Sequence, residues 1–264
     1  MITSIHNAKI QQVRSLQARS RSRREAQAFV IEGVRLAEEA LQGNWPAQLV
    51  LFTEELSERG QSVVNGYAER GAPVEQVSPP VMRAASDTQN PQGILVVLPM
   101  RSLPLPENPG FIFIPDVVRD PGNLGTMLRT AAAAGVEGVL LPPGSVDPFS
   151  PKVVRAAMGA HFHLTIHSSG WEGIRATLKN AALRVYLASV GAGLVYTQAD
   201  FRSPLALIIG GEAEGAGPES QALADEQIHI PMPGRAESLN AAVAAAILLF
   251  EVVRQRETPE GTQP

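Results

Sequence analysis

Three segments of this sequence combine polar side chains with glycine or proline turns, and each contains or follows a run of apolar residues. They are residues 116–129 (DVVRDPGNLGTMLR), 205–217 (LALIIGGEAEGAG) and 228–240 (IHIPMPGRAESLN). Their amide, carboxylate, hydroxyl and guanidinium groups can orient a hydroxyl-bearing or cationic ligand and stabilise charge that develops on it. Ligands in α/β folds collect where strands end and helices begin, so these segments form the candidate site.

The first segment predicts a helix that starts near Asn123, because a Pro-Gly turn precedes this residue and Asn is a favoured N-cap. Gly125 allows a close backbone approach at the start of the helix. Apolar residues then recur at helical spacing and predict the buried face, which consists of Leu124, Met127, Leu128 and Ala131. Arg129 lies off this face, so its side chain points either toward a cleft or toward water.

The second segment is a buried strand that runs into a glycine-rich loop with two carboxylates, Glu212 and Glu214. It matches neither the Gly-x-Gly-x-x-Gly fingerprint nor a phosphate-binding loop that ends in Lys-Ser or Lys-Thr. Two carboxylates also suit a phosphate poorly. The loop is therefore predicted to serve a cationic or hydroxyl-rich ligand rather than a nucleotide phosphate.

The third segment leads into a helix predicted over residues 239–254. Its apolar residues at a period of 3.6 predict a buried stripe of Leu239, Val243, Ala246, Ile247 and Phe250. Ser238 and Asn240 at the start of this helix are either helix caps or parts of a specially shaped turn. Two prolines and a glycine directly before them favour the second interpretation.

Strands and helices alternate along the whole chain, which predicts an α/β fold with mostly parallel sheets covered on both faces. Prolines crowd residues 99–109 and predict an extended linker between two domains. The predicted strands are 29–31, 48–52, 74–77 and 94–98 before the linker, and 111–115, 138–141, 162–166, 184–189, 205–209 and 228–231 after it. The predicted helices are 34–41, 61–70 and a turn after Pro80, then 124–134, 152–158, 171–180 and 239–254.

The composition excludes several classes of protein. Hydrophobic residues make up 44% of the 264 residues and the mean hydropathy is +0.01, so a sizeable core is available and dominant disorder is excluded. Cysteine is absent, which excludes disulfide scaffolds, cysteine-ligated metals and a thiol nucleophile. No apolar run is long enough to span a bilayer, and no apolar stretch of a secretory signal follows the basic N-terminus. We therefore expect a cytoplasmic protein without a membrane segment.

Charge is distributed unevenly along the chain. The net charge is −4, but residues 1–25 carry six basic residues and one acidic residue, so the remaining 239 residues have a net charge of −9. A basic segment before an acidic body favours an arm that contacts RNA phosphates through Arg19, Arg21, Arg23 and Arg24. A solvated helix face or a frayed terminus is the alternative.

Taken together, the three segments resemble the motifs of the SpoU/TrmH branch of the SPOUT RNA 2′-O-ribose methyltransferases. The matching residues are Asn123, Gly125 and Arg129 in the first motif, Gly210, Glu212 and Gly215 in the second, and Ile230 to Gly234 with Glu237 to Asn240 in the third. Residues 145–159 are also similar to the family, and residues 26–98 are similar to the substrate-binding domain of its two-domain members. Gly211, Ala213 and Ala157 depart from the residues that many relatives carry, which leaves details of the cofactor and substrate contacts open.

The resemblance implies a knotted parallel-sheet SPOUT domain over residues 110–256, preceded by a smaller L30e-like α/β RNA-binding domain over 26–98, with a disordered tail over 257–264. It implies S-adenosylmethionine as cofactor, no metal, and a homodimer formed through the C-terminal domains near the last helix. The implied cofactor contacts are Gly210, Gly211, Ile230, Met232 and Leu239. The implied catalytic set is Arg129 with Asn123, Glu212, Ser238 and Asn240.

Methyl transfer to a ribose 2′-hydroxyl requires the donor carbon and the acceptor oxygen about 3–3.5 Å apart and help in removing a proton from a weakly acidic alcohol. The family assigns catalysis to Arg129. An arginine guanidinium stays protonated in proteins, so electrostatic stabilisation of the developing alkoxide, or orientation of the ribose phosphate, is preferred over a role as base.

The two-domain organisation favours a large folded substrate, so 23S ribosomal RNA is the expected target. A transfer RNA methyltransferase of the same family and a catalytically silent RNA-binding assembly factor are the alternatives. A nucleotide-binding oxidoreductase is disfavoured because neither domain carries Gly-x-Gly-x-x-Gly after its first strand. Base methylation is disfavoured because the Asn, Arg and Ser-Leu-Asn residues resemble the ribose-methylating group.

Overall fold

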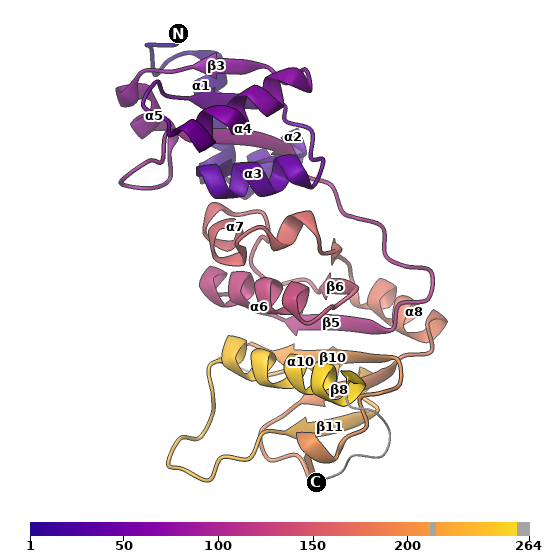
Figure 1. Cartoon of the computed structure of the whole chain (residues 1–264). Coiled ribbons are helices and arrows are strands. Elements are labelled where there is room, and N and C mark those ends of the chain that lie inside the picture. Colours follow the sequence, from indigo (N-terminus) through magenta and orange to yellow (C-terminus); the bar gives the residue numbers. More distant parts are fainter. Residues whose placement is uncertain (212–214, 258–264) are drawn as a thin grey trace. The chain divides into compact units, whose positions relative to one another are not determined.

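The computed structural model describes residues 1–211 and 215–257, and these form two compact units (Figure 1). The first unit consists of Met1–Arg101 together with Asp147–Phe162. The second consists of Ser102–Val146 and the described residues from His163 onward. The division at Arg101 and Ser102 falls within the proline-rich segment. Apart from Glu257, the tail predicted to be disordered lies outside the described residues.

The first unit is built on a four-stranded sheet with the strand order β1-β4-β2-β3. Its elements are α1 (Ala8–Ala18), α2 (Ser20–Ala26), β1 (Ala28–Glu32), α3 (Val34–Gln42), β2 (Leu49–Phe52), α4 (Glu58–Glu69), β3 (Val74–Gln76), α5 (Pro79–Ala85), β4 (Ile94–Pro99), α7 (Pro151–Ala157) and the 3-10 turn η1 (Ala160–Phe162). The prediction of a mostly parallel sheet is wrong here, because β4 runs antiparallel to both β1 and β2. Alternation with helices does not fix the direction of a strand. After the loop over 86–93, β4 begins at the end of the sheet where β1 and β2 finish.

Both faces of this sheet are covered, and alternate residues of each strand supply the two cores. On β1, Phe29 and Ile31 pack with α3 and α4, whereas Ala28 and Val30 pack with α1 and α5. On β4 the same alternation separates Ile94, Val96 and Leu98 from Leu95 and Val97. Because both faces are buried, these strands are continuous apolar runs in the sequence, and their β-branched and aromatic residues made them recognisable.

The N-terminal basic segment is part of this packing, so it is not an extended arm. Ile10, Val13 and Leu16 of α1 are buried in the core on one face of the sheet, and Asn7 caps the helix by accepting a hydrogen bond from the amide of Lys9. The helical period of these three apolar residues is present in the sequence, but the concentration of charge around them obscured it. Most of the arginines of α1 and α2 therefore lie on the solvated face of packed helices.

Residues 147–162 also belong to the first unit, although the predicted domain boundaries place them in the methyltransferase domain. Val154 and Phe162 are buried in its core, and the ring of Phe162 contacts that of Trp45 at a centroid distance of 5.4 Å. The strand predicted over 162–166 is therefore wrong. Phe162 ends a 3-10 turn, and β7 begins only at Ile166.

The second unit contains a seven-stranded sheet in which every pair of neighbouring strands is parallel. The strand order is β7-β6-β5-β10-β8-β11-β9, so β10 and β11 each insert between strands formed earlier in the chain. The elements are β5 (Phe111–Asp116), α6 (Pro121–Ala133), β6 (Gly138–Leu141), β7 (Ile166–Ser168), α8 (Trp171–Asn180), β8 (Arg184–Ala188), β9 (Leu194–Val195), η2 (Tyr196–Gln198), β10 (Leu205–Gly210), α9 (Pro218–Leu223), β11 (Glu226–His229) and α10 (Ala241–Glu257). The prediction of a parallel sheet is confirmed for this unit.

Helices cover both faces of the second sheet. Ile112, Ile114 and Ile208 pack with α8 on one face, and α6 and α10 pack against each other on the other face (Figure 1). The strand predicted over 228–231 ends earlier, at His229, because Pro231 and Pro233 lack the amide hydrogen that extends a sheet.

The long final helix buries a different face from the one predicted. Ala245, Leu248, Leu249 and Val252 are fully buried, whereas Val243 and Phe250 are 47% and 48% exposed. Both stripes are apolar and both recur at helical spacing, so periodicity alone could not decide which one faces α6. The predicted stripe, which includes Val243 and Phe250, therefore forms an apolar patch on the surface of this unit.

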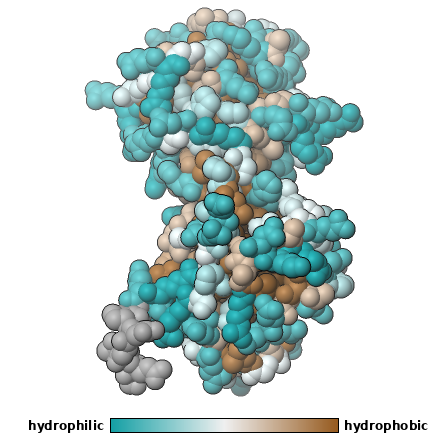
Figure 2. Space-filling view, turned by 90° about the vertical axis from the view of Figure 1, so that its right-hand side faces the viewer, coloured by the Kyte–Doolittle hydropathy of each residue, from teal (hydrophilic) through white to brown (hydrophobic). Residues whose placement is uncertain are grey.

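The helices in the described parts of the chain lack the combination of length and hydrophobicity that crossing a bilayer requires. Most of the surface visible in Figure 2 is hydrophilic, and hydrophobic residues reach it in separate patches.

His161 makes the first unit sensitive to acid. Its ring is buried beside Phe29 and Phe149, and Nε2 donates to the carbonyl oxygen of Pro148 at 2.7 Å. The buried Nδ1 has no hydrogen-bond partner among residues 1–211 and 215–257. Burial lowers the pKa of His161 to about 4. The unfolded chain, with a histidine pKa of about 6.5, therefore takes up the proton first as the pH falls.

We predict that the free energy of unfolding decreases by about 3 kcal/mol from this residue alone between pH 6.5 and pH 4, and that this contribution levels off below pH 4. Chemical denaturation of a Trp171→Phe background, in which Trp45 is the remaining tryptophan, measures it by fluorescence at a series of pH values. His161→Gln should remove this part of the slope, and substitution of the exposed His163 should not. Equal slopes in wild type and His161→Gln would contradict the assignment.

Candidate active site

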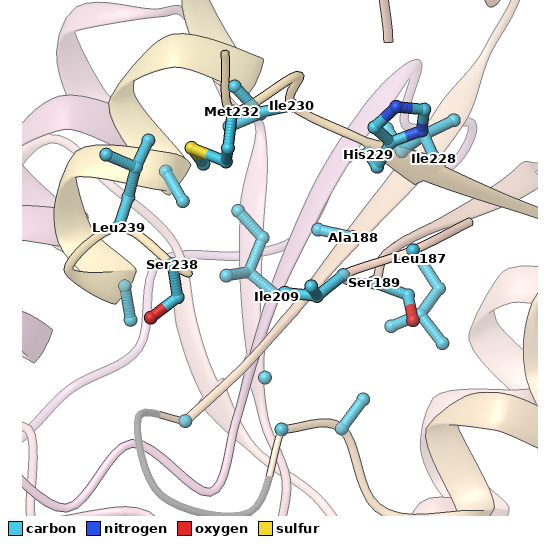
Figure 3. Close-up of a pocket in the computed structure, with 18 of the residues that line it drawn as sticks. Leu187, Ala188, Ser189, Ile209, Ile228, His229, Ile230, Met232, Ser238 and Leu239 are labelled. Carbon is cyan, nitrogen blue, oxygen red and sulfur yellow. The ribbon is translucent and has the colours of Figure 1, made fainter. Parts of the chain in front are cut away.

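A cavity of about 560 Å³ opens at the carboxyl ends of β8, β10 and β11 in the second unit. Parallel strands that end at one edge bring their following loops together, which is the usual place for a ligand in such folds. Figure 3 shows side chains from these three strand ends and from the loop before α10 around one space. The lining residues are Leu187, Ala188, Ser189, Val190, Gly191, Ile209, Gly210, Gly211, Gly215, Ala216, Gln221, Ile228, His229, Ile230, Met232, Glu237, Ser238, Leu239, Ala241 and Ala244.

All five predicted cofactor contacts, Gly210, Gly211, Ile230, Met232 and Leu239, line this cavity. The two glycines have a steric reason to be there. A Cβ on Gly210 would lie 2.4 Å from the backbone of Gly215 and Ala216, and one on Gly211 would lie 2.5 Å from the carbonyl oxygen of Val117. Any side chain would therefore push these backbone segments apart and change the shape of the cavity.

The walls are mainly apolar with a few polar groups, as is usual for small-molecule sites. Ile209, Ile228, Met232 and Leu239 supply apolar surface, and Ser238 lines the cavity next to Leu239 (Figure 3). The other polar side chains include Ser189, Gln221 and Glu237. Among the described residues, no three histidine, aspartate or glutamate side chains lie close enough together to hold a metal ion.

A hydrogen bond joins the first and third predicted segments. Nδ2 of Asn240 donates to Oδ1 of Asn123 at 3.1 Å, across a sequence separation of 117 residues. Oδ1 of Asn240 accepts from the amides of Ala242 and Val243, so Asn240 also caps α10. Of the two interpretations left open for Asn240, the helix cap is confirmed, and the bond to Asn123 is a second contact of the same side chain.

The predicted role of Asn123 as helix cap is wrong. Asp120 caps α6, because its carboxylate accepts a hydrogen bond from the amide of Asn123 at 2.8 Å. Pro121 then occupies the first turn, where its missing amide hydrogen does no harm. The side chain of Asn123 is therefore available for Asn240.

Arg129 lies on α6, six residues after Asn123 and about 9 Å further along the helix axis. Its side chain is exposed, whereas Leu124, Met127 and Leu128 are buried. The prediction that Arg129 lies off the packing face is confirmed. Arg129 is not among the residues that line the cavity.

Glu212 lies outside the described residues. Of the four predicted RNA contacts, Arg19, Arg21 and Arg24 are exposed in the first unit. Arg23 is only 4% exposed, and the prediction is wrong for it. Its guanidinium donates to Asp147 at 2.6 and 2.8 Å and to the carbonyl oxygens of Leu16 and Gln17, so its donors stabilise the fold.

The sequence analysis missed the contribution of β8 to the cavity. Residues 187–191 lie at its carboxyl end and line the cavity together with His229 and Gln221. A signal was present, because the predicted strand 184–189 is followed directly by Val-Gly-Ala-Gly, a loop of the same kind as the one after β10. Without the sheet order, nothing indicated that β8 lies next to β10.

Comparison with known protein families assigns both parts of the chain. The profile of the SpoU rRNA Methylase family matches residues 110–250, and that of the MRM3-like substrate binding domain matches residues 7–96. The chain belongs to the SpoU family. Its predicted family and enzyme class, that of a methyltransferase, are confirmed.

Named SpoU relatives match over nearly the whole chain. The 23S rRNA (guanosine(2553)-2′-O)-methyltransferase RlmP of Bacillus subtilis is 34% identical, and the match covers 95% of this chain and 98% of the relative. The 23S rRNA (uridine(2479)-2′-O)-methyltransferase of Streptomyces viridochromogenes is 31% identical over 97% of this chain and 92% of the relative.

Solved SpoU structures share the fold. The AdoMet-bound rRNA methyltransferase from Sinorhizobium meliloti superposes with a TM-score of 0.88 at 32% identity and covers 97% of this chain and 98% of its own. AviRb from Streptomyces viridochromogenes in complex with AdoMet gives a TM-score of 0.85 at 28% identity, over 95% of this chain and 99% of its own. The predicted fold class, a SPOUT-type parallel sheet preceded by a smaller α/β unit, is confirmed.

The two functions of the Asn240 side chain can be separated in this SpoU enzyme. Asn240→Asp keeps the acceptor for the amides of α10 but loses the donor to Asn123. We predict that it retains wild-type stability and loses at least tenfold in methyl-transfer rate.

Asn240→Ala loses both functions, and we expect it to unfold with about 1 kcal/mol less free energy. Denaturant titration and single-turnover methyl transfer measure the two effects. Full activity in Asn240→Asp would show that the bond to Asn123 has no part in the reaction.

Proposed function

We propose that this protein transfers a methyl group from S-adenosylmethionine to a ribose 2′-hydroxyl of 23S ribosomal RNA. The observation that carries the proposal is the cavity at the carboxyl ends of β8, β10 and β11, in which all five predicted cofactor contacts meet. The Asn123–Asn240 hydrogen bond connects the start of α10, next to this cavity, to the helix that carries Arg129.

The residues of the cavity fit S-adenosylmethionine. Bound there, the cofactor would supply a methyl group on a positively charged sulfur. Gly210 and Gly211 let the backbone approach the ligand closely, and Ile230, Met232 and Leu239 offer apolar surface to an adenine ring and a thioether-like chain. Ser189 and Gln221 supply a hydroxyl and an amide group for the ribose and the amino-acid end of the cofactor.

The reaction requires charge stabilisation at the acceptor oxygen. The exposed guanidinium of Arg129 can lie against the ribose 2′-oxygen and its neighbouring phosphate, where it stabilises the negative charge that develops on this oxygen. The oxygen takes the methyl group, the hydroxyl proton passes to solvent water, and S-adenosylhomocysteine is the leaving group. Asn123 and Asn240 hold the starts of α6 and α10 together, which keeps Arg129 in a fixed position relative to the cavity. We infer that Ser238, which lines the cavity, orients the acceptor ribose.

The choice of 23S ribosomal RNA rests on the relatives. Both named enzymes act on 23S rRNA, and their similarity extends through the first unit as well as the second. The first unit also matches a substrate-binding domain, which a large folded RNA would require. Transfer RNA methylation and a role as a silent assembly factor are the alternatives that the following experiment distinguishes.

The test is to map ribose methylation in ribosomal and transfer RNA of a strain that lacks this protein. We predict the loss of one or a few 2′-O-methyl groups from 23S rRNA, their return with the wild-type gene, and no return with Arg129→Ala. In vitro, Arg129→Ala should lower kcat at least 100-fold, because one electrostatic contact to a developing oxyanion contributes about that much. Its melting temperature and its affinity for S-adenosylhomocysteine should stay at wild-type values.

Arg175→Ala is the matched control, because Arg175 is an exposed arginine on α8 of the same unit. Loss of methylation from transfer RNA alone would replace the substrate proposed here, and an unchanged map in both RNA classes would support the assembly-factor alternative. Full activity of Arg129→Ala would remove Arg129 from the mechanism.

We propose further that the solvated face of α1 and α2 contacts RNA phosphates through Arg19, Arg21 and Arg24. Replacing all three with glutamine should weaken RNA binding and reduce the slope of log K against log salt by up to about 3, because each phosphate contact contributes about 0.9. Filter binding at several salt concentrations measures both effects.

The matched control replaces Arg35, Arg59 and Arg70, which lie on or directly after α3 and α4, the helices on the other face of the sheet. Arg23→Gln should instead lower the melting temperature, since it breaks the bonds to Asp147. An unchanged salt slope in the triple variant of α1 and α2 would favour a merely solvated face.

We propose that the exposed apolar stripe of α10 forms a homodimer interface. Val243, Ile247 and Phe250 are spaced i, i+4 and i+7, so they share one face of the helix, and Val243 and Phe250 are about half exposed. An apolar stripe of this kind on a helix favours burial against a partner.

Light scattering at micromolar concentration should give twice the chain mass for the wild type. Phe250→Glu combined with Val243→Glu should give a monomer that stays folded. Ile5→Glu, a substitution at an exposed apolar residue of the first unit, should leave the dimer intact. A monomeric wild type would contradict this interface.

A further inference from the structure

Asp116 is a fully buried carboxylate at the start of the first segment, and it is not one of the residues matched to the family motifs. It is the last residue of β5, has 0% exposure, and pairs in register with Gly210, a residue that lines the cavity. Burying an ionisable side chain is unfavourable unless other groups satisfy it. Its presence at this strand end therefore requires a reason.

One carboxylate oxygen of Asp116 holds the chain on the far side of the glycine-rich loop. Oδ2 accepts a hydrogen bond from the amide of Gly217 at 2.7 Å and another from the hydroxyl of Ser220 at 2.8 Å. Ser220 is itself fully buried, and both donors lie at the start of α9. These two short bonds fix the position of α9 relative to the end of β5.

The segment held in this way forms part of the cavity wall. Gly215 and Ala216 precede Gly217, Gln221 follows Ser220, and all three line the cavity. Gln221 also donates from Nε2 to the carbonyl oxygen of Ala216 at 3.0 Å, which ties the start of α9 to the chain before it. A shift of Gly217 and Ser220 would therefore move this wall.

The residue after Asp116 contacts the other end of the same loop. Val117 has a φ of +51°, which is a strained conformation for a β-branched residue. Its carbonyl oxygen lies 2.5 Å from the position that a Cβ on Gly211 would take. Asp116 and Val117 thus touch the loop at Gly217 and at Gly211. The chain continues from them to Asn123, so the same turn also starts the segment that carries Arg129.

Resting on the proposed function, we propose that Asp116 is a positioning residue. It holds residues 215–221, which form part of the cavity wall, in a fixed position relative to the segment that contains Asn123. It acts through Gly217 and Ser220 and does not touch the reacting atoms. Among the described residues, Oδ1 of Asp116 has no hydrogen-bond partner, so the two bonds at Oδ2 hold the carboxylate in this part of the structure.

The test measures cofactor affinity apart from turnover. Calorimetry with S-adenosylhomocysteine should show affinity reduced at least tenfold in Asp116→Ala and about three- to tenfold in Ser220→Ala. The KM for S-adenosylmethionine should rise in parallel, while kcat at saturating cofactor falls less than threefold. Asp116→Asn should restore most of the affinity, because an amide oxygen can accept both hydrogen bonds.

Asp225→Ala is the matched control. Oδ2 of Asp225 accepts from the amide of Val185 at 2.8 Å, at the amino end of β8 and away from the cavity. This variant should lower the melting temperature without a change in cofactor affinity. Wild-type affinity in Ser220→Ala, together with either wild-type affinity or failure to fold in Asp116→Ala, would overturn the proposal. A wild-type protein that binds no S-adenosylhomocysteine would overturn this proposal and the proposed cofactor together.

Discussion

The close backbone contact at the carboxyl end of β10 is the constraint on which the site depends. Gly210 packs against the backbone of Gly215 and Ala216, and Gly211 packs against the carbonyl oxygen of Val117. At these distances only a residue without a Cβ fits. This contact places the turn after β5 directly against the loop after β10, and the cavity lies next to them.

A second constraint acts between the two helices on one face of the sheet. α6 and α10 belong to segments more than 100 residues apart, and their apolar faces pack against each other. The Asn123–Asn240 bond lies at their starts and fixes their register along the helix axes. Packing of this kind gives a rigid support for groups that must meet a substrate with an accuracy of about 0.5 Å.

The first unit is also stabilised by helices that pack on both faces of a sheet. Alternate residues of its strands supply two cores, and the N-terminal helices cover one of them. Residues 147–162 complete the other core, and the buried bonds between Arg23 and Asp147 join that segment to α1 and α2. An arginine that looked like a nucleic-acid contact in the sequence therefore has a purely structural set of partners, whereas Arg19 and Arg24 remain on the surface.

Local chemistry in the sequence was enough to predict the α/β class and most strands and helices, because apolar β-branched runs, helical period and glycine-rich turns depend on neighbouring residues. The family followed from the resemblance of three motifs, and the same resemblance pointed to the five residues that line the cavity. Three features depended on tertiary structure instead. The direction of β4 and the order of the parallel strands follow from the path of the chain, so the contribution of residues 187–191 to the cavity could not be predicted. Which of the two apolar stripes of α10 is buried depends on packing against α6, because both stripes recur with the same helical period. The burial of Arg23 and of Asp116 follows from partners 124 and about 100 residues away, Asp147 and Gly217, and no local pattern carries that information.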